Sequence, residues 1–253
     1  MDLNYSFWIT AILAASFVGL GKGGIPVIAS LAVPSLSLFM SPITAAGLLL
    51  PVYIVSDVFA LFVYRRDYDP KVLKIAFFGM TLGVAIGTLT AHLIVEWILV
   101  LLIGLMGFIF AIRLMINQDT NQIARVKIIN IPRGIFWTSL SGFTSFISHN
   151  GGPPWQIFVL PLKLTKSVFV GTSVITFSYV NFIKLFPYIW LGQVNIQSTY
   201  VSIFLMLPAS IAVYLGVKWI KVVSEKLFFN LVTWALLLIS IKLIWDGIAG
   251  GFF

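Results

Sequence analysis

The stretch Gly21-Lys22-Gly23-Gly24-Ile25-Pro26 interrupts an apolar run near the start of the chain. A second stretch, Ser148-His149-Asn150-Gly151-Gly152-Pro153-Pro154, interrupts another apolar run in the second half. Glycine and proline sustain helical hydrogen bonding poorly, and each stretch also carries polar side chains. Irregular backbone at membrane depth is stable only where protein or water covers it. Two such breaks at corresponding places in two halves of a chain favour a transporter binding site.

The composition around these breaks is typical of an all-α polytopic membrane protein. Of the 253 residues, 60% are hydrophobic and 9% are charged, against roughly 25% charged in soluble domains. Apolar runs close to the roughly 20 residues that span a bilayer recur along the chain. The net charge of +8 is better explained by basic cytoplasmic loops than by a nucleic-acid partner. Cysteine is absent, which excludes disulfides and thiolate chemistry.

The apolar segments fall into two similar halves, residues 1–116 and 134–253, joined by a polar linker over 117–133. We expect each half to hold a broken-helix hairpin and about three transmembrane helices. The expected segments are 6–20, 25–39, 42–64, 72–94 and 96–115, then 134–147, 154–162, 167–190, a helix ending near 217 and one ending near 245. Gly23-Gly24 aligns with Gly151-Gly152, and Asp57 with Asn181, as internal transporter repeats do.

Charge predicts the orientation in the membrane. Most of the 16 Lys and Arg residues lie in or beside four segments, 65–74, 117–133, 163–166 and 218–226. The positive-inside rule assigns these segments to the cytoplasm. Segment 42–64 then runs inward and 167–190 outward, so the two repeats are inverted and both termini face outside. We expect a multi-pass protein of the bacterial inner membrane, with the lipid bilayer as a partner and a homodimer as one possible assembly.

Polar residues in the breaks are candidates for substrate binding. Lys22 is expected to contact an anion, because an ammonium near the bilayer centre usually faces a cavity or a partner. The alternative for Lys22 is a hairpin tip at the membrane interface, with its amine in water. His149 donates to an anion or carries a proton at physiological pH, and Asn150 donates through its amide. For His149 the alternative is a structural hydrogen bond.

The paired glycines are candidates for a separate reason. Gly23, Gly24, Gly151 and Gly152 leave backbone N–H groups open to a ligand. The segments 25–39 and 154–162 are expected to begin there as helices, and helix N-termini attract anions. The alternative is that each Gly-Gly pair only permits close helix packing.

Three polar residues inside long apolar segments complete the candidate site. Asp57 is expected to carry a proton or cation or to pair with a lysine, the alternative being a structural ion pair. Asn181 is its counterpart in the second half, and Lys184 lies one turn later on the same helical face. Lys184 binds the anion or snorkels toward the outer interface. Lys242 and Asp246 are most simply an exposed pair.

Enzyme motifs are absent from the sequence. No HExxH, GxSxG or P-loop sequence occurs, so we expect no catalytic residue, cofactor or metal. The pattern favours a secondary transporter of a small anion, driven by protons or by another gradient. An anion channel, a carrier of a small carboxylate and a membrane scaffold without transport remain as alternatives.

Motifs in both halves resemble the sulfite exporter TauE/SafE family. The first half carries Gly19-Leu20-Gly21-Lys22-Gly23-Gly24, Pro34, Pro42, Ala45, Ala46 and Tyr64-Arg65-Arg66-Asp67, and the second Ser141-Gly142-Phe143, Gly151-Gly152, Pro161 and Gly171-Thr172-Ser173. The resemblance covers nearly the whole chain. It implies secondary transport of sulfite, sulfonates or related small anions across the bacterial cytoplasmic membrane, often as export. The chain departs from the family's glycine triplets by having Lys22 in the first and His149-Asn150 in the second.

Overall fold

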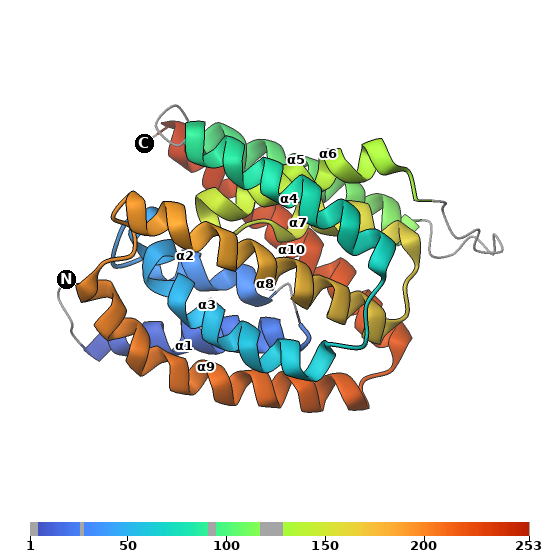
Figure 1. Ribbon diagram of the computed structural model, residues 1–253. Helices are drawn as coiled ribbons and strands as arrows, with labels where there is room; N and C mark the ends of the chain where they lie inside the picture. Colours follow the sequence, from blue (N-terminus) through green and yellow to red (C-terminus); the bar gives the residue numbers. More distant parts are fainter. Residues whose placement is uncertain (1–4, 26–27, 91–94, 117–128, 253) are drawn as a thin grey trace. The chain divides into compact units, whose positions relative to one another are not determined.

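The computed structural model describes residues 5–25, 28–90, 95–116 and 129–252, and every regular element in them is helical (Figure 1). The all-α fold class is therefore confirmed. The elements are α1 (Tyr5–Gly23), η1 (Ile28–Leu31), α2 (Ala32–Leu36), α3 (Pro42–Tyr64), α4 (Pro70–Thr90), α5 (Glu96–Ile116), α6 (Ile131–Ser148), α7 (Gly152–Val159), η2 (Leu160–Leu162), α8 (Lys166–Trp190), α9 (Ile196–Val222) and α10 (Glu225–Phe252). Pro26 and residues 117–128 of the expected linker lie outside the described residues.

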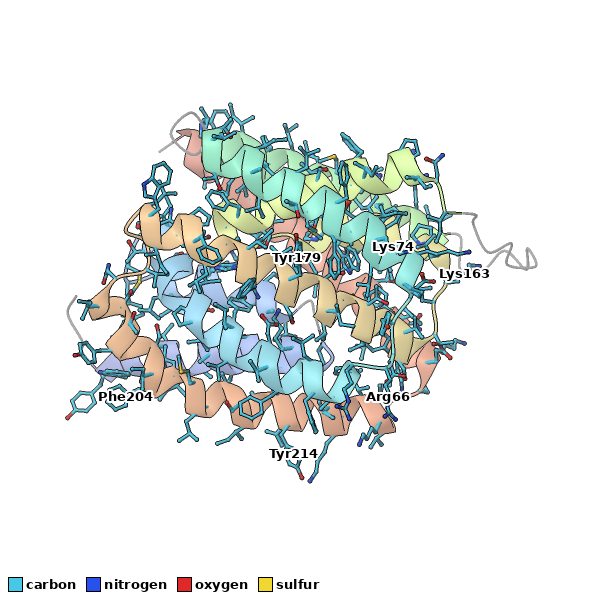
Figure 2. The ribbon with its side chains drawn as sticks, viewed as in Figure 1. Arg66, Lys74, Lys163, Tyr179, Phe204 and Tyr214 are labelled. Atoms are coloured by element: carbon cyan, nitrogen blue, oxygen red, sulfur yellow. The ribbon has the colours of Figure 1, made fainter. Side chains whose placement is uncertain are left out.

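Six helices in the described residues, within α1, α3, α4, α8, α9 and α10, are long and apolar enough to cross a membrane. Their outer faces carry large apolar side chains that no protein covers. On α9, for example, Phe204 is 70% exposed and Tyr214 is 59% exposed, and both project outward (Figure 2). So much exposed apolar surface is unfavourable in water and suits lipid. The chain is a multi-pass membrane protein.

The helices form two compact units, and each unit takes helices from both halves of the sequence. The first unit comprises residues 1–77 and 167–223, and the second comprises 78–166 and 224–253. The boundary between them falls within α4, after Phe77. The units therefore do not coincide with the expected repeats 1–116 and 134–253, and the inverted repeat stays a prediction.

In the first unit, α9 lies along α1 and α3 (Figure 1). Small residues permit this close approach, as is usual between membrane helices. A Cβ on Gly216 would lie 2.9 Å from the Cα of Gly23, and a Cβ on Gly19 would lie 2.7 Å from the Cβ of Ala212. The Ser202 hydroxyl of α9 also donates a hydrogen bond of 2.6 Å to the Leu48 carbonyl of α3.

In the second unit, α10 lies along α5, and α4 lies along α6 (Figure 1). Glycines again mark the contacts. A Cβ on Gly142 of α6 would lie 2.5 Å from the Met80 carbonyl oxygen of α4. A Cβ on Gly104 of α5 would lie 2.7 Å from the Ile244 nitrogen of α10.

The long helices match the sequence-based prediction more closely than the hairpins do. The prediction of 42–64 coincides with α3, and 154–162 closely matches α7 with η2. The predicted helix over 25–39 is wrong. The described part of this segment is a 3₁₀ turn and the five-residue α2, followed by turns. It still returns along α1, because Ala29 packs against Gly21 and the Phe39 ring lies 6.0 Å from the Phe7 ring.

The basic segments of the first unit lie at one end of it. There the Tyr64 hydroxyl, at the end of α3, donates a hydrogen bond of 2.7 Å to the Gly23 carbonyl at the end of α1. A Cβ on Gly24 would meet Ile220 near the end of α9. The loop after α3 reaches the start of α8, where the Asp69 N–H donates to the Thr172 hydroxyl at 3.0 Å. The predicted cytoplasmic segments 65–74 and 218–221 are therefore neighbours.

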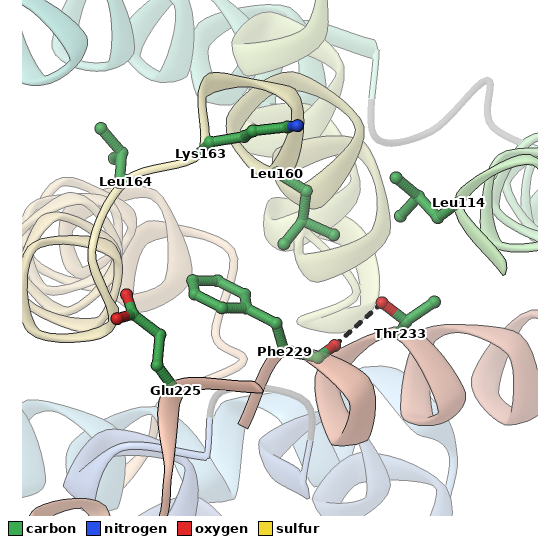
Figure 3. A pocket seen from close by; sticks show the side chains of 7 residues that line it. All are labelled: Leu114, Leu160, Lys163, Leu164, Glu225, Phe229 and Thr233. Atoms are coloured by element: carbon green, nitrogen blue, oxygen red, sulfur yellow. Dashed lines mark hydrogen bonds between the residues drawn. The ribbon is translucent and has the colours of Figure 1, made fainter. Parts of the chain in front are cut away.

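The basic segments of the second unit also lie together, at one end of that unit. A pocket of about 330 Å³ is lined by Leu114 of α5, by Lys163 and by Glu225 at the start of α10, and Figure 3 shows these side chains. The Lys166 N–H donates to the Glu225 carboxylate at 2.9 Å. The predicted cytoplasmic segments 163–166 and 224–226 thus lie at one end, together with the end of α5.

This arrangement gives a direct test of the predicted orientation. Because the chain has no cysteine, an introduced cysteine is the only thiol to react. We expect an impermeant maleimide added to intact cells to modify Leu191→Cys, in the exposed loop after α8, and to leave Arg66→Cys unmodified until the cells are opened. Labelling of Arg66→Cys from outside would contradict the predicted topology.

Candidate functional site

The residues predicted to bind substrate are divided between the two units. Lys22, Gly23, Gly24, Asp57, Asn181 and Lys184 belong to the first unit, and His149, Asn150, Gly151 and Gly152 belong to the second. Each group is described by itself.

The first glycine break begins later in the chain than the sequence indicates. Helix α1 continues through Lys22 to Gly23, so Lys22 lies in its last turn and not in the gap. Gly24 then has φ +141°, a conformation that favours glycine. The Ile25 N–H donates back to the Leu20 carbonyl at 3.1 Å, which closes the helix end.

Close packing accounts for Gly23, and at Gly24 it adds to the requirement set by the positive φ. A Cβ on Gly23 would lie 2.8 Å from the Cα of Gly216 and closer still to the Val213 carbonyl oxygen. A Cβ on Gly24 would likewise be too close to the Ile220 side chain. The expected helix N-terminus after this break is corrected, because only a 3₁₀ turn and the five-residue α2 follow. Donation from Gly23 and Gly24 to an anion stays a prediction.

Lys22 is the centre of a buried polar cluster. Its Nζ lies 2.5 Å from Asp57 Oδ1 of α3, and the second oxygen, Oδ2, accepts a hydrogen bond of 2.8 Å from the Asn181 amide of α8. The side chains of Lys22 and Asp57 are only 7% and 5% exposed. The Lys22 ammonium also lies 5.5 Å from the centroid of the Tyr53 ring and 6.0 Å from that of Phe177.

Helical spacing explains why these side chains converge. On α3, Tyr53 and Asp57 are four residues apart and therefore lie on one face. On α8, Phe177, Asn181 and Lys184 follow one another at intervals of four and three residues, again on one face. The positive charge of Lys22 at the end of α1 is also favoured by the helix dipole.

Lys184 is fully buried, which argues against the alternative that it snorkels to the outer interface, and anion binding by Lys184 stays a prediction. Its Nζ lies 5.8 Å from the centroid of the Tyr188 ring, and its charge interacts with those of Lys22 and Asp57. In the described part of the chain, the buried side chains that bear formal charge are two lysines and one aspartate. The burial of Lys22 likewise argues against the alternative that its amine lies in interfacial water.

A pocket of about 330 Å³ reaches this cluster at Asp57. It is lined mainly by apolar residues of α3 and α8 and by Phe77 at the start of α4. Among the described residues that line it, Asp57 alone bears a charge. Tyr179 also lines the pocket, and its ring lies 4.5 Å from that of Phe77.

The second break turns the chain between α6 and α7. His149 ends α6 in the left-handed conformation, with φ 55°. Side chains of α6 hold the turn, since the Ser141 hydroxyl donates to the Gly151 carbonyl at 2.6 Å and the Thr144 hydroxyl donates to the Asn150 carbonyl at 3.1 Å. Asn150 is buried, and its amide donates to the Ser148 hydroxyl at 3.2 Å.

Helix α7 starts here, as the sequence predicts, but it offers few backbone donors. Pro153 and Pro154 occupy its first turn and have no N–H group. Donation to a ligand is thereby limited to Gly151 and Gly152. Apart from its chain neighbours and the backbone of α7, no atom of the described residues lies within 4 Å of a Cβ built on Gly152, so open space adjoins it. One turn later, Gln156 Oε1 is buried with no hydrogen-bond partner in the described residues.

Several residues of the polar cluster were missed from the sequence. The Phe177 ring lies near the Lys22 ammonium and the Tyr188 ring near the Lys184 ammonium. In the sequence, both residues are typical of apolar positions in a membrane helix. Ser56 and Thr176 are buried without hydrogen-bond partners in the described part of α3 and α8, and no sequence signal distinguishes them. The expected exposed pair of Lys242 and Asp246 is confirmed, with side chains 39% and 40% exposed.

Membrane-spanning helices, a broken helix and a charged cluster sealed within the protein define a multi-pass membrane protein with a polar interior, as solute transporters have. The chain belongs to the sulfite exporter TauE/SafE family, whose model matches residues 8–243. This match spans both glycine breaks and confirms the resemblance seen in the motifs. No curated protein and no solved structure matches the chain.

Proposed function

We propose that this chain is a secondary transporter that moves a small anion across the bacterial inner membrane by alternating access, in the direction of export. The substrate class is sulfite, an organosulfonate or a related sulfur oxyanion, in keeping with the family. The observation that carries the proposal is the buried cluster of Lys22, Lys184 and Asp57. The family match and the buried cluster are independent observations, and both favour an anion transporter.

The chemistry of the cluster suits an anion. The cluster holds two lysine side chains and one carboxylate, so it can accept a further negative charge. Sulfur oxyanions accept charge-assisted hydrogen bonds from ammonium groups, and these bonds are strong where water is excluded. In the second unit, His149, Asn150 and the N–H groups of Gly151 and Gly152 remain the predicted further donors.

Binding of the anion is tested by thermal unfolding of the purified protein. The probes are sulfite, thiosulfate, taurine, sulfoacetate and methanesulfonate, with acetate and succinate as carboxylate controls. A bound anion at about 100 times its Kd stabilises the protein by about 2.7 kcal/mol. We expect Lys184→Met to lose this stabilisation, because it removes one amine and leaves the Lys22–Asp57 pair in place.

Lys242→Met is the matched control, since Lys242 pairs with Asp246 at a half-exposed position of α10. It should keep the full anion-dependent shift. Counterflow of labelled anion in proteoliposomes then separates a carrier from a channel. The absence of any shift with every anion, or an equal loss in both variants, would contradict the proposed site.

A further inference from the structure

We propose that Asp57 is the binding site for a coupling proton and acts as an internal anion that must be neutralised before the transported anion contacts Lys22. This inference rests on the proposed function and specifies how the same site is driven. It makes the protein a proton–anion symporter, in which the outward gradient of the anion drives export and one proton leaves with each anion.

The contacts of Asp57 support this role. Its Oδ1 lies 2.5 Å from Nζ of Lys22 and pairs with that ammonium. Its Oδ2 accepts a hydrogen bond of 2.8 Å from the Asn181 amide. An anion that contacted Lys22 with Asp57 ionised would bring two negative groups onto one ammonium inside the protein. Two negative groups in contact with the same ammonium repel each other strongly where the dielectric constant is low.

Protonation removes this conflict, and the proton and a monovalent anion together add no net charge to the site. Asp57 takes up a proton at its carboxylate and becomes a neutral carboxylic acid, and the Lys22 ammonium then pairs with the incoming anion. The neutral Lys22–Asp57 pair is replaced by a Lys22–anion pair beside a neutral acid. No bond other than the new O–H forms, and no net charge is buried for a monovalent anion.

The surroundings of Asp57 allow this exchange. Among the described residues, the titratable or charged groups that act on it are Lys22 of α1, Lys184 of α8 and Tyr53 of its own helix. The rings of Tyr53 and Phe177 flank the Lys22 ammonium and can hold it by cation–π attraction once the carboxylate is neutral. The pocket of about 330 Å³ also reaches Asp57, between apolar side chains of α3 and α8.

The simpler alternative is that Lys22 and Asp57 form a permanent ion pair that fixes α1 to α3. The permanent ion pair and the proton-coupled site predict a different dependence of anion binding on pH. A permanent pair takes up no proton when an anion binds. The coupled site takes up about one proton for each anion, so the apparent Kd rises about tenfold per pH unit wherever Asp57 is ionised in the anion-free protein.

The wild-type protein provides the first measurement. Calorimetric titration with thiosulfate and methanesulfonate, which stay ionised throughout the physiological range of pH, is carried out in buffers of different ionisation enthalpy. We expect proton uptake on binding and, in proteoliposomes, anion accumulation driven by an imposed pH gradient. Binding without proton uptake would overturn the inference and leave the proposed function intact. If no anion binds at any pH, the proposed function itself fails.

Asp57→Asn provides the second measurement, because asparagine imitates the protonated acid in shape. We expect anion affinity that no longer varies with pH, counterflow that is retained, and gradient-driven accumulation that is lost. Asp246→Asn is the matched control, since it neutralises the aspartate of the half-exposed pair on α10 and should behave as wild type. Retained gradient-driven accumulation in Asp57→Asn would overturn the inference. If Asp57→Asn does not fold, the wild-type proton uptake decides.

Discussion

We expect the Lys22→Met protein to be less stable than the wild type by about 3–5 kcal/mol of unfolding free energy, the usual cost of removing one partner of a buried ion pair. The Asp57 carboxylate, with its side chain 5% exposed, would lose its ammonium partner and keep the hydrogen bond from the Asn181 amide. The measurement is reversible unfolding in mixed micelles, followed by tryptophan fluorescence.

Two further variants isolate the cause of this loss. Lys22→Met combined with Asp57→Leu removes both charges and should recover most of the stability, while anion binding stays lost. Lys242→Met breaks a half-exposed pair and should cost about 0–1 kcal/mol. Equal costs for Lys22→Met and Lys242→Met would contradict the buried ion pair.

The second large effect is expected from Gly23→Ala. The new Cβ would lie 2.8 Å from the Cα of Gly216 and closer to the Val213 carbonyl oxygen, and both are backbone atoms of α9 that cannot rotate away. Helix α1 must then separate from α9, at a cost of about 1–3 kcal/mol. A fall in the thermal midpoint of the purified protein measures this cost.

Gly152→Ala is the matched control for this substitution. It introduces the same methyl group at the start of α7, where no atom of the described residues lies within 4 Å apart from its chain neighbours and the backbone of α7. Its thermal midpoint should match that of the wild type. A midpoint of Gly23→Ala that equals that of Gly152→Ala would show that the packing of α1 on α9 is looser than the structure indicates.

The long helices could be predicted because their ends carry local signals. At the start of α3, Ser41 accepts a hydrogen bond from the Thr44 N–H, and Pro42 occupies the first helical position. The apolar run then ends at a charged turn from Arg65. Such signals lie within a few residues of one another, so the sequence contains them without tertiary information.

Segment 25–39 could not be predicted in this way. Its apolar residues are compatible with a continuous helix, and periodicity cannot distinguish such a helix from a 3₁₀ turn followed by a single helical turn. Contacts with other segments select the observed form. The Ala29 carbonyl, for instance, accepts a hydrogen bond of 2.9 Å from the Tyr53 hydroxyl of α3.

The candidate site could be predicted in its residues but not in its contacts. Alignment of the two halves paired Asp57 with Asn181, and these two side chains are in fact hydrogen-bonded. A lysine partner for Asp57 was one of the expectations, but its identity as Lys22 depends on how α1 packs against α3. Residue types indicate which groups need partners, and only the fold selects the partners.

The pairing of α1 with α9 also constrains how the protein is made. The glycine face of α1, including Gly19 and Gly23, leaves the ribosome well before its packing partner α9, which ends at Val222. During most of synthesis this face must therefore be held by lipid or by the insertion machinery. Truncation before α9 should leave the N-terminal hairpin exposed to quality-control proteases, however intact its own sequence is.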